Sequence, residues 1–296
     1  MPEIARSEWR EDRYGFLRWL VLPAQGWSEW WDRIYIDPDL KKRLLAYADF
    51  CLRHRNEYER VGLPVHGILL LHGPPGTGKS SLARGLAEIV AQGMARDGVA
   101  DQVIFAEVDP HALPSQMLGE SQRNVINLLE KALPELAGRG LPVIVVIDEV
   151  DSLVTRRTMT TGGRDPVDVM RATEAVLRGV DYLASASPNV LVVATSNFVE
   201  AIDEAMLDRI DIAARIDLPS PHQIELILRD TLGELACSEV SDAEVTTLAT
   251  ALEGRSGRDI RKLVLEALVT RGTDPSTPLR FDEIQAVIDR EKGRTP

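Results

Sequence analysis

Eight consecutive residues fit the phosphate-binding pattern G-x-x-x-x-G-K-[ST]: Gly73-Pro74-Pro75-Gly76-Thr77-Gly78-Lys79-Ser80. An apolar stretch over 67–72 precedes this P-loop and an amphipathic stretch over 81–90 follows it, which predicts a buried strand and a helix. That order aims backbone N–H groups and a helix N-terminus at phosphates. Lys79 can reach the β and γ phosphates, and the Ser80 hydroxyl can ligate Mg²⁺. The flanking elements argue against a chance glycine-rich turn, and with Ser81 added, residues 73–81 are expected to bind ATP.

Two more apolar stretches end in polar side chains suited to hydrolysis. Residues 143–147 run into Asp148 and Glu149, and residues 191–195 run through a serine into Asn197. Downstream of a P-loop, Asp148 is expected to hold Mg²⁺, usually through water, and Glu149 to orient and deprotonate the attacking water. The Asn197 amide can hydrogen-bond the γ-phosphate and that water. The alternatives are that the acids cap the following turn and that Asn197 is a turn residue.

Two arginines complete the predicted catalytic set. Arg258 opens a helix near the C-terminus, where its guanidinium can grip the γ-phosphate. Arg209 follows a short helix and suits an arginine finger offered to the ATP of the next subunit. The alternative for Arg209 is a salt bridge with Asp208 or Asp211. Arg215 is the second candidate for the finger.

Composition predicts a folded protein with an acidic surface. The chain has 296 residues, of which 44% are hydrophobic, and a net charge of −12. The acidic balance argues against nucleic acid as the main partner, because phosphate contacts need a basic surface. Cys51 and Cys237 fit no metal-ligand spacing, which favours free thiols in a reducing compartment. Because neither a signal-peptide pattern nor an apolar run of membrane-spanning length is found, we expect a cytoplasmic protein without membrane contact.

The sequence pattern divides the chain into three parts. Residues 1–36 hold all five tryptophans, and this lead is expected to pack on the main domain or, alternatively, to offer a docking surface to a partner. Residues 37–218 predict an α/β domain with a five-stranded parallel sheet flanked by helices. Residues 219–296 predict a small helical lid. The expected strands are 67–72, 103–108, 142–148, 190–195 and 212–217, and the expected lid helices are 221–235, 242–252, 257–271 and 281–291.

These parts, in this order, resemble an AAA+ ATPase. A narrower resemblance is to the pachytene checkpoint protein 2 family, also called thyroid receptor-interacting protein 13, over about Leu22 to Glu266. Its most discriminating segments are Ser256-Gly257-Arg258 in the lid and Asp208-Arg209-Ile210-Asp211-Ile212 at the domain edge. The other matching segments are Leu22-Pro23-Ala24, Trp31-Asp32, Leu70–Lys79, Asp165–Arg171, Ala175–Leu177 and Thr195–Asn197.

The resemblance implies a homohexameric ring that remodels HORMA-domain proteins. The family converts them from a closed, peptide-bound form to an open one by pulling a terminal segment through the central pore. Only about twenty residues precede the match, which fits short bacterial members that separate a HORMA protein from a cyclic-nucleotide-synthesising enzyme in antiphage (CBASS) operons. The first pore loop falls on Met117, Leu118 and Gly119, where the family usually has an aromatic followed by an apolar residue. Met117 can still grip varied side chains, and helix-end packing is the alternative.

Three other functions are open to such a chain. One is a general unfoldase or protease regulator, although nothing in the sequence docks a protease. Another is a nucleotide-switched DNA-associated protein of the initiator or clamp-loader type, which the acidic balance and the lack of a basic recognition helix oppose. The third is an inactive scaffold, which the complete set of Lys79, Asp148, Glu149, Asn197 and Arg258 opposes.

Overall fold

The computed structural model describes residues 16–24, 26–63, 65–108, 120–153, 166–234, 239–271 and 278–292. Among the helices in these ranges, none is long and apolar enough to cross a membrane. Contacts divide the chain into two compact units. The larger, here called the sheet unit, draws on Met1–Trp31, Asp39–Gly73 and Ser80–Arg215, and the smaller, the lid unit, draws on Asp32–Pro38, Pro74–Lys79 and Ile216–Pro296.

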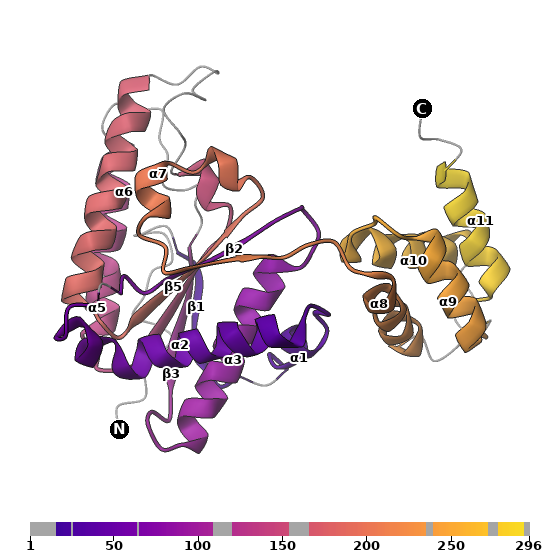
Figure 1. Cartoon of the computed structure of the whole chain (residues 1–296), viewed down its shortest axis with the longest axis horizontal. Helices are drawn as coiled ribbons and strands as arrows, with labels where there is room; N and C mark the ends of the chain where they lie inside the picture. The colour runs from indigo at the N-terminus through magenta and orange to yellow at the C-terminus, as the bar shows by residue number, and fades with distance from the viewer. Residues whose placement is uncertain are drawn as a thin grey trace. The chain divides into compact units, whose positions relative to one another are not determined.

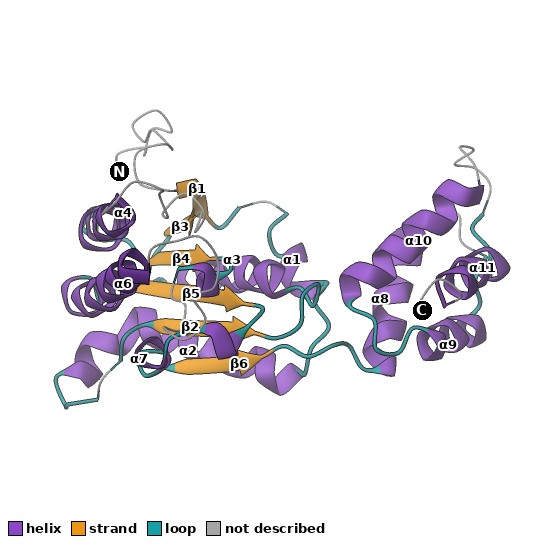
Figure 2. Ribbon diagram, turned by 90° about the horizontal axis from the view of Figure 1, so that it is seen from above, coloured by secondary structure: helices purple, strands orange, loops and turns teal. Residues whose placement is uncertain are grey.

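The sheet unit is built on a six-stranded sheet with the strand order β1-β3-β4-β5-β2-β6 (Figure 2). Five neighbouring strands run parallel and correspond to the five predicted stretches. Their continuous apolar sequences suit burial on both faces, and every residue of β3, β4 and β5 is buried. The parallel strands are β2 (Ile68–His72), β3 (Val103–Val108), β4 (Val143–Ile147), β5 (Val190–Ser196) and β6 (Ile212–Arg215).

The sixth strand, β1 (Phe16–Leu22), corrects the expectation of a purely parallel five-stranded sheet. It pairs antiparallel with β3, with Leu22 opposite Val103 and Trp19 opposite Ala106. Only the two end residues of β1 are buried, since the strand forms the edge of the sheet. It therefore lacks the continuous apolar pattern by which the parallel strands were predicted.

The described tryptophans at 27 and 31 pack on the sheet unit, as the first of the two alternatives for the lead predicts. The ring of Trp27 meets Phe105 of β3 edge-on, with 4.9 Å between the ring centroids. Lys41 donates from Nζ to the Trp31 backbone oxygen at 2.6 Å and lies 5.0 Å from the centroid of the Trp31 ring. Both contacts fix the lead onto elements of the main domain.

Helices cover both faces of the sheet, with α6 on one side of the strands and α3 on the other (Figure 1). Alternate strand residues such as Leu70, Val145 and Val192 share one apolar core with α4, α5, α6 and the π-helical turn η3. The helical segments of the sheet unit and its borders are α1 (Glu29–Asp32), α2 (Pro38–Glu59), α3 (Lys79–Arg96), α4 (Glu120–Asn127), η3 (Leu128–Ala132), α5 (Leu133–Ala137), η4 (Val150–Ser152), α6 (Pro166–Ala186), η6 (Val199–Ala201) and α7 (Glu204–Leu207).

Within the described part of the lid unit, four helices match the predicted ones: α8 (Pro221–Glu234), α9 (Asp242–Ala251), α10 (Gly257–Arg271) and α11 (Phe281–Lys292). They bury one apolar core of their own. Side chains define the helix starts, because Ser241 and Glu244 form a capping box at α9 and the Ser256 hydroxyl accepts from the Asp259 backbone N–H at 3.3 Å at α10.

Candidate active site

Three parallel strands end side by side at one edge of the sheet, in the order β4-β5-β2. The Gly73 backbone N–H, directly after β2, donates to the Ser196 oxygen at the end of β5 at 3.3 Å. Asp148 and Glu149 follow β4, and Asn197 follows β5. The topology therefore brings the predicted acids, the predicted amide and the start of the P-loop to the same edge.

A buried threonine links the two acids. The Thr195 hydroxyl donates to Oδ1 of Asp148 at 2.8 Å and accepts from the backbone N–H of Glu149 at 3.2 Å, and Thr195 is only 2% exposed. Glu149 has φ 52° and ψ 48° and is the one non-glycine with a positive φ among the described residues. Such backbone strain costs about 1–3 kcal/mol and persists where the surroundings impose it. Thr195 was not predicted as a site residue; its signal is a polar side chain near the end of an apolar strand.

The P-loop backbone fits a phosphate chain. Gly76 and Gly78 have φ of 78° and 93°, the left-handed region that favours glycine. A Cβ on Gly78 would lie 2.6 Å from Cδ1 of Ile34. Lys79 is 6% exposed and donates from Nζ to the Pro74 oxygen at 2.8 Å, so its ammonium lies over its own loop. A glycine turn, a confined ammonium and a helix N-terminus are the groups that bind phosphates in such loops.

Within the lid unit, helix α10 begins against the P-loop. The Arg258 backbone N–H donates to the Gly76 oxygen at 3.1 Å, and a Cβ on Gly76 would lie 2.4 Å from Oγ of Ser256. The Arg258 side chain is exposed. The predicted lid arginine thus belongs to the same compact unit as residues 74–79 of the loop.

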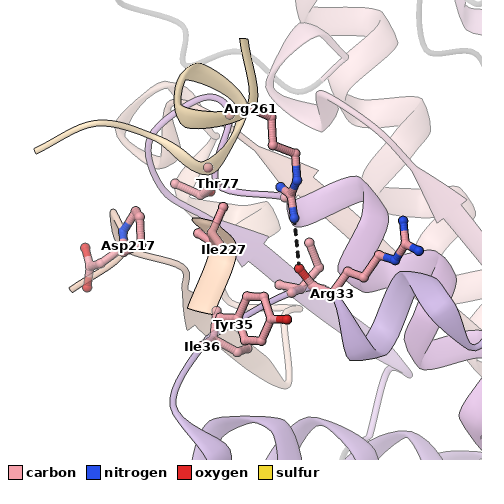
Figure 3. Close-up of a pocket in the computed structure, with 12 residues that line it drawn as sticks. Arg33, Tyr35, Ile36, Thr77, Asp217, Ile227 and Arg261 are labelled. Atoms are coloured by element: carbon pink, nitrogen blue, oxygen red, sulfur yellow. Dashed lines mark hydrogen bonds between the residues drawn. The ribbon is translucent and has the colours of Figure 1, made fainter. Parts of the chain in front are cut away.

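A pocket opens beside the P-loop in the lid unit (Figure 3). It encloses roughly 350 Å³, including space open to solvent, and its wall includes Thr77 together with the apolar side chains of Ile34, Ile36 and Ile227. Tyr35 adds an aromatic ring. The wall also carries the charged residues Arg33, Asp217 and Arg261, and this mixture of apolar and polar groups suits a flat group that has both, such as a nucleobase next to the phosphates.

Charged groups at this pocket form a small network. Arg261 donates from Nη2 to the Arg33 oxygen at 3.3 Å and lies 3.8 Å from Oδ2 of Asp230 (Figure 3 shows the first contact). Burial, followed by the charge of Asp230, raises the pKa of Tyr35 above its ordinary value, so the phenol is neutral. Sequence reasoning missed this pocket, and the only signal for it was the apolar run at residues 34–36 inside the lead.

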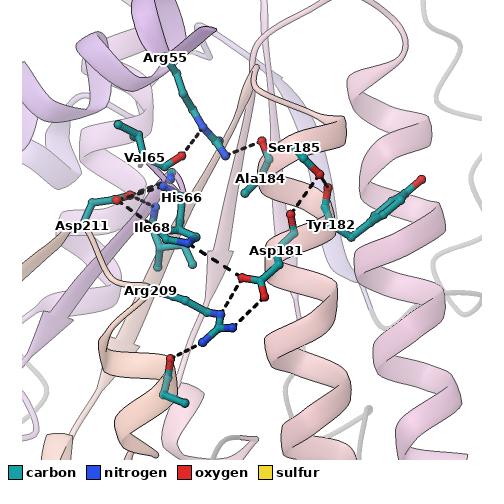
Figure 4. Close-up of polar contacts among 12 residues, drawn as sticks. Arg55, Val65, His66, Ile68, Asp181, Tyr182, Ala184, Ser185, Arg209 and Asp211 are labelled. Atoms are coloured by element: carbon teal, nitrogen blue, oxygen red, sulfur yellow. Dashed lines mark hydrogen bonds and ion pairs between the residues drawn. The ribbon is translucent and has the colours of Figure 1, made fainter. Parts of the chain in front are cut away.

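Arg209 is held by an acid that the sequence analysis did not consider (Figure 4). Its Nε and Nη2 donate to Oδ1 and Oδ2 of Asp181, each at 2.7 Å, and its Nη1 donates to the Ala205 oxygen at 2.8 Å. These hydrogen bonds hold the pKa of Asp181 below its usual value and raise that of Arg209. The salt-bridge alternative named Asp208 or Asp211, but the hydrogen-bonded partner is Asp181 of α6.

The two finger candidates lie at opposite ends of strand β6. Arg215 pairs in register with His72, at the edge where β2 runs into the P-loop. Arg209 lies before β6, at the other end, where the Asp211 backbone N–H donates to the Ile68 oxygen at 3.0 Å. Ile68 and His72 are four residues apart, which is about 13 Å at about 3.3 Å per residue of strand. The backbones that carry the two candidate fingers are therefore about that far apart along the sheet.

The remaining predicted site residues are located by their position along the helices and strands. Ser80 and Ser81 lie in the first turn of α3, at its N-terminus, and Asn197 is half-buried at the end of β5. The predicted pore-loop residues Met117, Leu118 and Gly119 lie outside the described residues.

Comparisons with known proteins agree with this architecture. A family model described as "ATPase family associated with various cellular activities (AAA)" matches residues 69–218. CD-NTase-associated protein 6 of Pseudomonas aeruginosa is 41% identical over an alignment of 287 residues, which covers 94% of this chain and 92% of that protein. The pachytene checkpoint protein 2 homolog of Gallus gallus is 31% identical, over 96% of this chain and 72% of that protein.

A solved structure shows the same fold. The match is to a chain of the E. coli MS115-1 HORMA:CdnC:Trip13 complex, with a TM-score of 0.78, 18% identity, and coverage of 93% of this chain and 95% of that one. The domain match and the two relatives make this protein a nucleotide-binding ATPase. The chain belongs to the AAA family of ATPases and, within it, to the family that includes pachytene checkpoint protein 2 and CD-NTase-associated protein 6.

Proposed function

We propose that this chain forms a homohexameric ring that uses ATP to remodel HORMA-domain proteins. It converts the closed HORMA form to the open one and takes apart complexes that contain it, and so regulates a bacterial cyclic-nucleotide antiphage system in the cytoplasm. The observation that carries the proposal is the 41% identity to CD-NTase-associated protein 6 over nearly the whole of both chains. The partner is a HORMA protein, alone or bound to a cyclic-nucleotide synthase, which the fold match to a chain of the HORMA:CdnC:Trip13 complex supports.

The proposal assigns ATP and Mg²⁺ to the P-loop edge. Residues 73–81 bind the phosphates, and the triphosphate's base and sugar enter the pocket lined by Tyr35 and Ile227. Ser80 and Asp148 hold the metal, the latter through water, since oxygen ligands suit Mg²⁺. Mg²⁺ supplies charge neutralisation on the β and γ phosphates. The same proposal divides the chain into a lead (1–36), a hydrolysing domain (37–218) and a lid (219–296).

In this mechanism Glu149 takes the proton of the attacking water. Its left-handed backbone and the hydrogen bond to Thr195 fix the direction in which the carboxylate leaves the strand. Asn197 orients the water from the neighbouring strand end, and Arg258 grips the γ-phosphate from the lid. All three groups belong to the subunit that binds the ATP. They position the reactants and stabilise charge, and none of them forms a covalent bond with the substrate.

Arg209 is assigned to the neighbour's ATP. It lies at the end of the sheet opposite to its own P-loop, which favours action on another subunit. Arg215, at the P-loop end of β6, is the less suitable candidate. Mixing Arg209→Ala with Lys79→Ala subunits should restore hydrolysis at interfaces that pair an intact finger with an intact P-loop. No recovery at any ratio, with assembly confirmed by mass photometry, would count against a finger acting in trans.

Glu149→Gln tests the catalytic assignment and the remodelling function together. The variant should bind ATP but hydrolyse it at least about 100-fold more slowly, because the water loses its base. A labelled closed HORMA–peptide complex should be dissociated by the parent with ATP and should stay bound to the variant. An ATPase rate within a few-fold of the parent would remove Glu149 from its role. If the parent hydrolyses ATP but leaves the complex intact, the HORMA assignment is wrong.

The pore-loop assignment has its own test. Met117→Ala/Leu118→Ala should keep basal ATPase and melting temperature but lose dissociation of the HORMA complex, because these residues transmit force rather than bind nucleotide. The packing alternative predicts that stability and ATPase fall together, since core truncations cost about 2–5 kcal/mol each. Dissociation at the parental rate by the double variant would end the threading model.

A further inference from the structure

The guanidinium of Arg209 is only partly used by its contacts within the chain. A guanidinium has five N–H donors, one on Nε and two on each terminal nitrogen. Described residues engage three of them, through Asp181 at Nε and Nη2 and through Ala205 at Nη1. Contacts with the described residues therefore leave one N–H on Nη1 and one on Nη2, and two such donors can bind two oxygens of a single phosphate. The Arg209 side chain is 25% exposed, so it is not sealed within its own subunit.

From this arrangement we infer that Asp181 is a positioning residue, which holds the guanidinium of Arg209 side-on so that its terminal N–H pair is presented to the γ-phosphate of the neighbouring subunit's ATP. The inference rests on the proposed trans role of Arg209 and adds the group that orients it. Asp181 acts through Arg209 and has no contact with nucleotide in this scheme.

Both attachments of the finger are anchored in the sheet unit (Figure 4). Asp181 belongs to the long helix α6. Two residues after Arg209, the carboxylate of Asp211 accepts from Tyr47 Oη at 2.6 Å and from the backbone N–H groups of residues 66, 67 and 68 at 3.0, 2.7 and 3.0 Å. The backbone that carries the finger is thus fixed at one point and its guanidinium at another, which leaves few alternative directions for the side chain.

A histidine lies between the two acids. His66 Nε2 is 4.0 Å from Oδ1 of Asp181, and His66 Nδ1 is 3.8 Å from Oδ1 of Asp211. These distances are too long for hydrogen bonds, so His66 acts on Asp181 through its charge alone, and only when it is protonated. The short bidentate pair is the contact that sets the guanidinium plane.

The alternative is that the pair only stabilises the fold. Its members are 25% and 47% exposed, and most exposed ion pairs contribute little to folding, although a bidentate arginine–carboxylate pair can contribute more. The exposure favours the orienting role, while the bidentate geometry fits both roles. The two explanations differ in what they predict for melting temperature and for turnover.

The test compares isosteric and conservative variants of the full chain. Asp181→Asn keeps the shape of the side chain but removes its charge and one acceptor, and it should lower kcat for ATP about 10- to 100-fold, the penalty of a misplaced catalytic group. Asp181→Glu should recover part of that loss. Glu174→Gln, an exposed acid two turns earlier on α6, is the matched control and should stay within twofold of the parent. Binding of a fluorescent ADP analogue, ring assembly and melting temperature should be unchanged in all three, because the finger is assigned to the γ-phosphate, which ADP lacks.

Two further measurements separate this inference from the proposed function. Arg209→Ala should lose at least about 100-fold in kcat, and adding Asp181→Asn to it should change nothing more. Lys79→Ala subunits, whose Asp181 is intact, should restore turnover when mixed with Asp181→Asn subunits. If Arg209→Ala retains parental turnover, the finger itself is wrong. If Arg209→Ala loses turnover but Asp181→Asn keeps or raises it, the positioning role of Asp181 is overturned. The same holds if Asp181→Asn lowers turnover and melting temperature together, or if adding it to Arg209→Ala lowers turnover further.

Discussion

The hydroxyl of Thr195 can be removed with almost no change in shape, and that change isolates its role between the two acids. Thr195→Val deletes the donor to Asp148 and the acceptor of the Glu149 N–H, at a site that is 2% exposed. Thr195→Ser keeps the hydroxyl and loses only a methyl group. The Val/Ser pair therefore compares loss of the hydrogen bonds with loss of packing.

Two opposing effects set the stability of Thr195→Val. A hydrogen bond to a charged group contributes about 1.5–3 kcal/mol and a neutral one about 0.5–1.5 kcal/mol. Once the Glu149 N–H has lost its acceptor, the backbone of Glu149 can leave the left-handed region. This relaxation relieves strain and stabilises the variant by up to about 1–3 kcal/mol. The free energy of unfolding should therefore fall by only about 1–2 kcal/mol. Turnover should fall about 10- to 100-fold, because both Asp148 and Glu149 lose the group that orients them.

The assay combines urea unfolding, binding of a fluorescent ADP analogue and steady-state ATPase for the parent, Thr195→Val and Thr195→Ser. Binding should stay within a few-fold for both variants, because the P-loop is untouched. Thr195→Ser should hydrolyse ATP within threefold of the parent. If Thr195→Val hydrolyses ATP as fast as Thr195→Ser, the hydroxyl does not orient the acids and the reasoning fails.

Other residues give independent tests. Gly78→Ala should weaken nucleotide binding at least about tenfold, because φ is 93° and the new Cβ would lie 2.6 Å from Ile34. The control is Gly93→Ala in α3, which has nothing within 4 Å of its new Cβ and should bind normally and gain up to about 1 kcal/mol of stability. Equal nucleotide binding by the two variants would contradict the loop geometry. Burial alone would raise the pKa of Glu107, but hydrogen bonds from two arginines outweigh it and lower that pKa. The stability lost in Glu107→Gln, about 1–3 kcal/mol, should therefore be constant from pH 7 to about 5 and shrink as pH falls through about 4.3 and the lower folded-state pKa. If the stability difference between the parent and Glu107→Gln grows as the pH falls, the argument is wrong.

The sequence predicted the parallel strands and lid helices because burial on both faces leaves a continuous apolar pattern. The ends of those strands then placed Asp148, Glu149 and Asn197 at one edge without further information. β1 was missed since an antiparallel edge strand has one exposed face and a partner that no local pattern identifies.

Contacts between distant segments account for the rest of what sequence could not provide. The hydroxyl of Thr195 reaches Asp148 only through the register of β4 against β5. Arg209 was paired with its sequence neighbours, but its partner Asp181 lies 28 residues away on α6. Tyr35 lines a pocket with residues of the P-loop and the lid, segments that only the folded chain brings together.

The pairing of β1 with β3 also determines when the sheet can be completed. Arg18 of β1 and Glu107 of β3 form an ion pair across 89 residues of chain. Because a ribosome releases N-terminal segments first, β1 emerges well before its partner, with β2 and α3 between them. Until β1 docks, β3 presents an unpaired edge to other nascent chains. Deleting residues 16–22 should therefore first appear as aggregation during synthesis, while the nucleotide chemistry of any folded molecules persists.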